Sequence, residues 1–170
     1  MAIINTIKDF ILPIAAFVIS IISLGISKKS ELLSKGEIEF HMATLIRDAQ
    51  YRVSDKGIDL AKYRSTFLKS LENNPQMSQE DLEKALENDL EYNVLMISFN
   101  QSVEIMLNAY EESCAKYLDK KVDSERFKRS YHKAIRDVVE NQEFKENFNS
   151  HTTPYKCILK VYNKWYNLEK

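Results

Sequence analysis

An uninterrupted apolar segment stands near the start of the chain, from Phe10 to Ser27. Its residues, FILPIAAFVISIISLGIS, carry no formal charge, and charged residues bound it on both sides. A helix of this length rises about 27 Å, close to the ~30 Å hydrocarbon core of a bilayer. Because lipid offers no partner to unpaired backbone groups, a spanning segment must be helical. The pattern therefore predicts a single transmembrane helix over residues 1–27.

One face of this predicted helix is small and polar. With successive residues about 100° apart, these positions fall in a strip about 80° wide, and Ile, Leu, Phe and Val cover the rest. The strip fits either a seam where helices of several copies pack closely, or the wet lining of a pore between copies, with Asp9 as a ring of carboxylates near one mouth. Both arrangements require self-association. The strip consists of Asn5, Asp9, Pro13, Ala16, Ser20, Ser23 and Ser27.

Flanking charge predicts the orientation of this segment. Lysines at positions 28, 29 and 35 follow it, whereas only Lys8 and the α-amino group precede it. The positive-inside rule then places residues 28–170 in the cytoplasm. A cleaved signal peptide is the alternative, but its apolar region is normally about 7–15 residues long and ends in an A-x-A-like site. Here the segment ends GISKKS, which favours a retained anchor.

The rest of the chain is predicted to be helical almost throughout. It contains few breakers, with 3 Gly and 3 Pro in the whole sequence, and 29% of all residues are charged. Apolar residues recur at helical spacing over residues 28–56, which predicts a stalk helix that continues from the membrane segment. Asp55, Lys56 and Gly57 break this pattern, so a cytoplasmic helical bundle is predicted over residues 57–170.

Caps and breakers divide the predicted bundle. Asn73, Asn74 and Pro75 form the clearest stop in the chain. Ser78 and Asp123 are expected to cap the helices that follow them, and Thr153 with Pro154 marks the start of the last helix. The four predicted helices span about 58–72, 78–118, 124–148 and 155–170.

Charge is unevenly divided between neighbouring predicted helices. Residues 78–119 hold ten acidic and two basic residues, a net charge of −8, whereas residues 120–136 hold seven basic and two acidic residues, a net charge of +5. Opposite signs favour pairing within one chain or between neighbouring subunits. A basic face also attracts RNA phosphates, but no aromatic residues interleave with the bases as stacking platforms. Charge pairing is therefore favoured over RNA binding.

The two cysteines give no sign of a cofactor. Cys114 and Cys157 are isolated in the sequence and lie outside any metal-ligand spacing. In a cytoplasmic domain they are expected to be reduced thiols. The sequence therefore indicates neither a metal site nor a cofactor.

A single spacing hints at catalytic chemistry. Arg126-Phe-Lys-Arg-Ser-Tyr-His132 fits R-x5-H, within the R-x4–6-H pattern of HEPN-type ribonucleases. In those enzymes two copies meet in a dimer, the His acts as acid or base at the 2′-hydroxyl, and the Arg stabilises phosphate charge. Phe127 departs from the polar residue usually found after the motif Arg. The other interpretation is a surface arginine and a histidine on an amphipathic helix.

The whole-chain layout resembles the small membrane accessory protein of type VI-B CRISPR systems, through its single span, its helical domain and the degenerate motif of Arg126 and His132. The resemblance implies a HEPN-like fold and a homo-oligomeric pore in the bacterial inner membrane. It also implies a functional link to an RNA-guided RNA-cleaving effector in antiphage defence, with Arg126 and His132 as structural or assembly residues. The residues that would line the pore are Asn5, Asp9, Ala16, Ser20 and Ser23.

Taken together, the sequence predicts an all-α protein with one N-terminal transmembrane helix and a cytoplasmic HEPN-like helical bundle. The predicted function is a homo-oligomeric channel: a ring in the lipid bilayer whose cytoplasmic domain drives assembly and gating. Permeation requires no catalytic residue. Two alternatives stay open, namely a membrane-tethered ribonuclease that uses Arg126 and His132, and a non-conducting membrane scaffold whose polar strip only packs helices.

Overall fold

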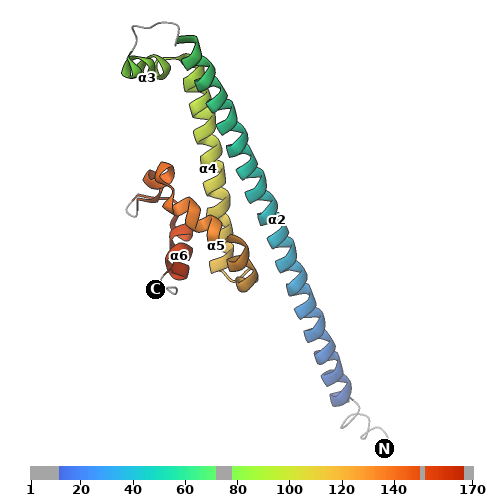
Figure 1. Cartoon of the computed structure of the whole chain (residues 1–170). Helices are drawn as coiled ribbons and strands as arrows, with labels where there is room; N and C mark the ends of the chain where they lie inside the picture. The colour runs from blue at the N-terminus through green and yellow to red at the C-terminus, as the bar shows by residue number, and fades with distance from the viewer. Residues whose placement is uncertain (1–11, 72–77, 150–151, 167–170) are drawn as a thin grey trace, which may run out of the picture. The chain divides into compact units, whose positions relative to one another are not determined.

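The computed structural model describes residues 12–71, 78–149 and 152–166, apart from the side chains of residues 12–16 and 18. All elements in these ranges are helical (Figure 1), so the predicted all-α class is confirmed for them. In chain order they are α2 (Leu12–Leu71), α3 (Gln79–Glu87), α4 (Leu90–Leu118), α5 (Ser124–Glu140), the 3-10 helix η2 (Gln142–Phe148) and α6 (Lys156–Tyr166).

The predicted transmembrane helix is not found. Among the residues described above, no helix combines the length and the apolar character needed to cross a membrane. Within the described part of α2, the uncharged stretch ends at Ser27. Lys28 and Lys29 follow at once. The predictions of a transmembrane helix, of a membrane pore or channel and of single-pass inner-membrane localisation are therefore wrong.

The chain forms two units, Met1–Phe40 and His41–Lys170, called here the amino-terminal and the carboxy-terminal unit. The described part of the amino-terminal unit belongs to α2 alone. Among the described side chains, all the buried apolar ones lie in the carboxy-terminal unit. That unit therefore holds the core.

α2 passes through Asp55, Lys56 and Gly57 without a break, so the predicted stalk and the first predicted bundle helix are one helix. A glycine inside a helix costs only about 1 kcal/mol relative to alanine, which packing can offset. A Cβ atom at Gly57 would lie 3.4 Å from the Phe99 ring of α4. Gly57 therefore gives this ring room against α2, and the packing of α2 on α4 overrides the local breaker.

The single helix predicted over residues 78–118 is two helices. α3 ends at Glu87 and α4 begins at Leu90, because the Asp89 carboxylate accepts a hydrogen bond from the Tyr92 N–H at 2.8 Å and caps a new helix. The Ser78 cap is confirmed, and its side chain and that of Asp81 form a reciprocal capping box.

Two further boundaries differ from the prediction near the end of the chain. The Asp123 cap is confirmed, but α5 ends at Glu140 and η2 follows it, so the helix predicted to reach residue 148 is shorter. α6 begins at Lys156 rather than beside Pro154. The Thr153 hydroxyl accepts a hydrogen bond from the Tyr155 N–H at 2.9 Å, which turns the chain just before α6.

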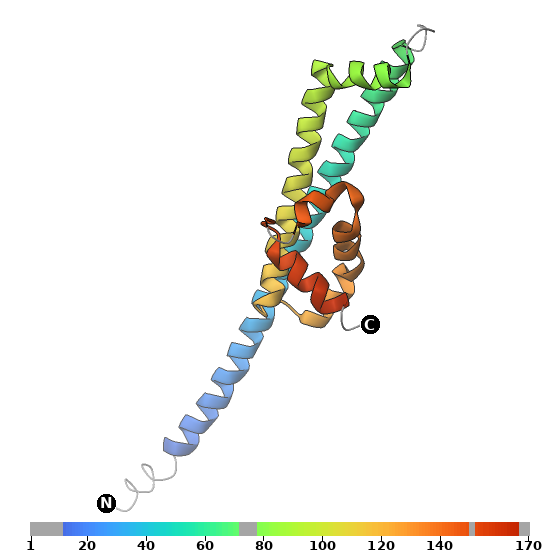
Figure 2. The ribbon, with the colours of Figure 1, turned by 90° about the vertical axis from the view of Figure 1, so that its left-hand side faces the viewer.

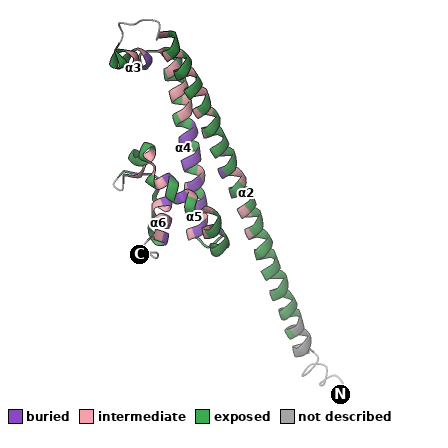
Figure 3. Cartoon of the chain, viewed as in Figure 1, coloured by how far each residue is buried: buried purple, intermediate pink, exposed green. Residues whose placement is uncertain are grey.

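The core of the carboxy-terminal unit is built around α4, whose lower half is buried (Figure 3). α6 packs mainly on α4, and α5 packs on α6. Along α4 the buried side chains follow helical spacing, as an inward face requires. The buried side chains of α4 and α6 are Ser102, Val103, Met106, Leu107, Tyr110, Ser113, Cys114, Tyr117, Ile158, Val161 and Trp165.

The start of α6 is held by a carboxylate from α4. Glu111 accepts hydrogen bonds from the Cys157 N–H at 2.8 Å and 3.0 Å, one to each oxygen, and from the Ile158 N–H at 2.9 Å. The first N–H groups of a helix have no partner within the helix, and the helix dipole makes this end partly positive. Glu111 therefore caps α6 from another helix.

We expect the Asp89 cap to be visible in the pH dependence of stability. The pKa of Asp89 lies below its ordinary value because the Tyr92 N–H and the Tyr63 hydroxyl donate to the carboxylate. Its ionised form therefore stabilises the folded chain fully above the unfolded-state pKa of about 4, and this contribution is lost as the pH falls through the lower folded value. Asp89→Ala should lower Tm by a few degrees near neutral pH.

The measurement is thermal unfolding followed by circular dichroism at neutral and at acid pH. The difference in Tm between wild type and Asp89→Ala should shrink below about pH 4. Asp89→Asn is the matched control, because asparagine caps helices as well as aspartate but does not ionise. A constant Tm difference across this pH range would contradict the assignment.

Candidate functional sites

The two residues of the R-x5-H spacing lie on α5 but do not meet within one chain. Arg126 is exposed in the first turn, and its backbone N–H donates to the Asp123 cap at 2.7 Å. His132 is half-buried, with its ring centroid 5.7 Å from that of Trp165. Six residues along a helix correspond to about 9 Å along the axis and about 120° around it. A ribonuclease role for Arg126 and His132 stays a prediction.

Neither cysteine is activated as a nucleophile. Burial raises the pKa of the Cys114 thiol, and burial together with a hydrogen bond to Glu111 raises the pKa of the Cys157 thiol. Both side chains are therefore thiols at neutral pH rather than thiolates, which are the reactive form. Within the described ranges, no group of three or more His, Cys, Asp or Glu side chains is placed to hold a metal ion.

The structure describes part of the predicted pore lining. Asn5 and Asp9 lie outside the described residues, and Ala16 lies in α2 without a described side chain. Ser20, Ser23 and Ser27 are exposed on α2, at intervals of three and four residues that keep them on one face. The other interpretation of the strip, a seam between the helices of several copies, stays a prediction.

The amino-terminal unit exposes a regular row of large apolar side chains on α2. We call it the heptad row, because its members recur every seven residues. Each has between 62% and 76% of its surface exposed. In coiled coils apolar residues alternate at intervals of three and four, so every seventh residue faces the same partner helix. The heptad row consists of Ile19, Ile26, Leu33 and Phe40.

Two glycines of the same unit have no steric reason to be glycine within the chain. A Cβ atom at Gly25 or at Gly36 would meet no atom within 4 Å. Each glycine costs about 1 kcal/mol of helix stability relative to alanine. This cost is offset where the absence of a side chain lets another backbone approach closely.

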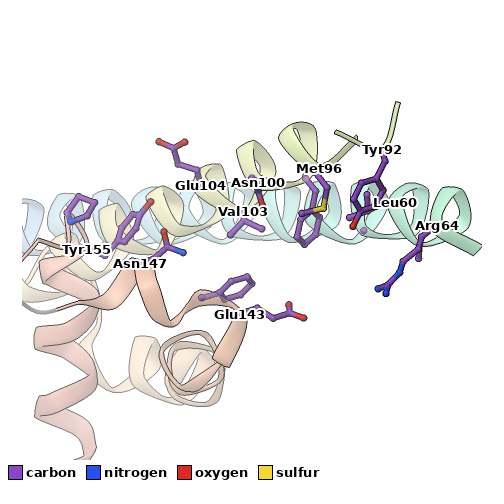
Figure 4. Close-up of a pocket in the computed structure, with 15 residues that line it drawn as sticks. Leu60, Arg64, Tyr92, Met96, Asn100, Val103, Glu104, Glu143, Asn147 and Tyr155 are labelled. Carbon is purple, nitrogen blue, oxygen red and sulfur yellow. The ribbon is translucent and has the colours of Figure 1, made fainter. Parts of the chain in front are cut away.

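The carboxy-terminal unit contains an open groove of about 850 Å³ between α2, α4 and η2 (Figure 4). α2 and α4 lie side by side in this unit (Figure 2), and each presents one face to the groove at spacings of three and four residues. The α2 face is Gly57, Leu60, Ala61 and Arg64. The α4 face is Tyr92, Met96, Phe99, Asn100, Val103 and Glu104. The remaining lining is Glu143, Phe144 and Asn147 of η2, with Pro154 and Tyr155.

Two side-chain hydrogen bonds join α2 to α4 on either side of the groove. The Tyr63 hydroxyl donates to Asp89 at 2.7 Å, and the Gln50 amide donates to the Tyr110 hydroxyl at 2.7 Å. The Asp89 carboxylate raises the pKa of Tyr63 to about 12, so this hydroxyl keeps its proton at neutral pH. The groove is therefore a preformed feature of the fold.

Three charged side chains border the groove: Arg64 on α2, Glu104 on α4 and Glu143 on η2. None of the three forms an ion pair or a side-chain hydrogen bond with another described residue. Figure 4 shows Arg64 near Tyr92 at one end of the groove and Tyr155 with Asn147 at the other. The groove thus combines an apolar floor with three charged side chains that form no ion pair among the described residues.

Comparison with protein-family models, with curated proteins and with solved structures finds no match for this chain. The resemblance to the CRISPR accessory protein, its HEPN-like fold and its link to an RNA-guided effector therefore stay predictions. The candidate sites rest on the geometry of this chain alone.

Sequence reasoning missed the groove. The heptad row is visible in the sequence, but it lies partly within the segment interpreted as a membrane span.

Proposed function

We propose that this protein is a self-associating scaffold whose copies join through α2 of the amino-terminal unit. The observation that carries the proposal is the heptad row, four large apolar side chains at seven-residue spacing that the described residues leave exposed. Self-association is also expected from the sequence, and association through the heptad row requires no membrane-spanning helix.

The energetics of an uncovered helix support the proposal. A helix without tertiary contacts is marginal in water, because most helix stability in proteins comes from packing an apolar face. Contiguous exposed apolar surface typically marks an interaction site. Between Ile19 and Phe40 the heptad row is about 32 Å long and spans three heptads. The second seam position of each heptad is occupied by Ile22, Lys29 and Gly36, so the heptad row itself supplies most of the apolar surface.

The partner that fits this surface is a second copy of the same helix. Two heptad rows are identical in spacing and length, so they match in register when the helices supercoil. Gly36 lies three residues after Leu33, about 60° around the helix, and leaves room for the neighbouring helix where a larger side chain would hold it away. Ile22 is 56% exposed and lies beside the heptad row, which widens the apolar seam.

The test is the molar mass of the purified full chain by light scattering after size exclusion. We expect the wild type to be a defined oligomer. The double substitution Ile26→Glu with Leu33→Glu should give a monomer, because it places unpaired carboxylates inside the seam, and each such burial costs several kcal/mol. The expected weakening of self-association is at least about 100-fold.

Leu24→Glu is the matched control. Leu24 is 63% exposed, like the heptad row, but it lies five residues after Ile19 and so about 140° around the helix. This variant should keep the wild-type mass. A monomeric wild type would overturn the proposal, and equal dissociation by Leu24→Glu would show that the heptad row is not the seam. Circular dichroism verifies that all variants remain helical.

A further inference from the structure

We infer that the groove between α2, α4 and η2 binds a short linear peptide that carries apolar side chains and a basic residue. This inference concerns the carboxy-terminal unit and is independent of the self-association proposed above. Four features of the lining carry it, namely the length, the floor, the amide groups and the charges.

The length of the groove suits a short extended peptide. Its α4 wall runs from Tyr92 to Glu104, which corresponds to about 18 Å of helix. An extended chain advances about 3.3 Å per residue, so this wall accommodates five or six residues. The volume of about 850 Å³ lies within the range of specific binding sites in proteins.

The floor provides pockets for apolar side chains. Met96 and Phe99 of α4 and Phe144 of η2 line it, together with Leu60 of α2. All four are only partly buried, so their remaining apolar surface is available to a partner. Aromatic rings and methionine are enriched at protein interfaces, and methionine adapts its shape to different partners. The floor therefore favours a ligand with two or more apolar side chains.

Two carboxamide side chains supply hydrogen bonds for a peptide backbone. Asn100 projects from α4 and Asn147 from η2, so the two amides come from different walls of the groove. A carboxamide offers both a donor and an acceptor, which matches the N–H and C=O groups of one peptide unit. A purely hydrocarbon ligand would leave these groups unpaired, which is costly on binding.

The charges determine which peptides are favoured. Glu104 and Glu143 contribute two carboxylates to the groove, against the single guanidinium of Arg64. Their lack of ion-pair partners in the described chain means that a bound cation gains a contact without breaking an existing one. A lysine or arginine of the peptide is therefore expected to face Glu104 or Glu143, and an acidic residue or the terminal carboxylate to face Arg64.

The test is selection from a phage-displayed library of random linear peptides on the immobilised full chain. We expect enriched sequences with apolar residues and at least one lysine or arginine, and synthetic copies should bind with micromolar Kd. Selection on the charge-reversed variant Glu104→Lys with Glu143→Lys should enrich acidic residues instead. No enrichment, or the same enriched charges on both proteins, would overturn the inference.

Ala61→Trp tests whether the selected peptides occupy the groove. Ala61 lies on the α2 wall and is exposed, so an indole there fills the groove without entering the core. Binding should weaken at least about tenfold. Thr66→Trp is the matched control, because Thr66 is exposed and nine residues from Gly57, about 180° around α2. It should bind like the wild type, and equal loss by both variants would overturn the inference.

Two further measurements separate this inference from the proposed function. The Ile26→Glu with Leu33→Glu variant should still bind the selected peptides, because its substitutions lie outside the carboxy-terminal unit. The Ala61→Trp variant should keep the wild-type oligomeric mass. If Ala61→Trp instead dissociates the oligomer, a second copy of this chain occupies the groove and the peptide inference is overturned.

Discussion

Replacing Trp165 with alanine is expected to destabilise the carboxy-terminal unit by about 4 kcal/mol. Trp165 has only 2% of its surface exposed, and its ring centroid lies 5.4 Å from that of Tyr117 and 6.0 Å from that of Phe127. Its Nε1–H donates to the Tyr117 hydroxyl at 3.0 Å. The substitution therefore leaves a large cavity between α4, α5 and α6 and removes a buried hydrogen bond.

The measurement is urea unfolding followed by circular dichroism, since Trp165 is the single tryptophan and its fluorescence is lost in the variant. Trp165→Phe should cost less, about 1–2 kcal/mol, because it keeps an aromatic ring and loses mainly the hydrogen bond to Tyr117. Asn163→Ala, at an exposed position of α6, is the control and should change stability by less than about 0.5 kcal/mol. A loss below about 1 kcal/mol for Trp165→Ala would contradict the packing described.

Local signals in the sequence were sufficient to place several helix ends. Ser78 and Asp123 were expected to cap helices, and both do so by accepting hydrogen bonds from backbone N–H groups three residues ahead. These interactions join near neighbours in the chain, so the sequence around them determines them. The long helix from residue 78 was placed correctly at both outer ends, and only the internal cap at Asp89 was missed.

Contacts between residues far apart in the chain could not be predicted from the sequence. Gly57 was interpreted as a helix break, because nothing in the local sequence shows that the Phe99 ring fills the space beside it. The groove brings together Arg64, Glu104 and Glu143, which lie far apart in the sequence. Side chains meet in this way only through the packing of α2, α4 and η2, and no motif spacing reports it.

The prediction of a membrane span for the apolar segment near the start is wrong because the same apolar pattern occurs in helices that contact lipid and in helices that contact protein. A helix that is apolar around most of its circumference suits either lipid or the interior of an assembly. The seven-residue spacing of Ile19, Ile26, Leu33 and Phe40 continues beyond Lys28 and Lys29, where a membrane segment would have ended. That continuation past the charges is the signal that favours a protein partner for α2.

Removing the carboxylate of Glu111 is the second change with a large expected effect. Glu111→Ala should destabilise the carboxy-terminal unit by about 3 kcal/mol, because the Cys157 and Ile158 N–H groups lose a charged acceptor and are left without partners at the end of α6. The interaction joins residues more than forty positions apart, so no local sequence pattern indicates it.

A control variant separates the loss of the cap from the general effect of removing a negative charge from α4. Glu112 is the matched control, because it is exposed on the same helix and its ion pair among the described residues is with Lys116, one turn away. Glu112→Ala should therefore cost less than about 1 kcal/mol. Glu111→Gln should fall between the two, because it keeps one acceptor oxygen but loses the charge that interacts with the helix dipole. Urea unfolding measures the stabilities.

Hydrogen exchange then locates the change within the molecule. In Glu111→Ala the amides of Cys157 and Ile158 should exchange faster than the global loss of stability requires, since their local acceptor is gone while the rest of α6 stays packed on α4. Equal stability of Glu111→Ala and Glu112→Ala, or unchanged exchange at these two amides, would contradict the cap. α6 packs mainly on α4, so the Glu111 cap stabilises the core between these two helices. The cap also fixes the position of Tyr155, which lies just before α6 and lines the groove.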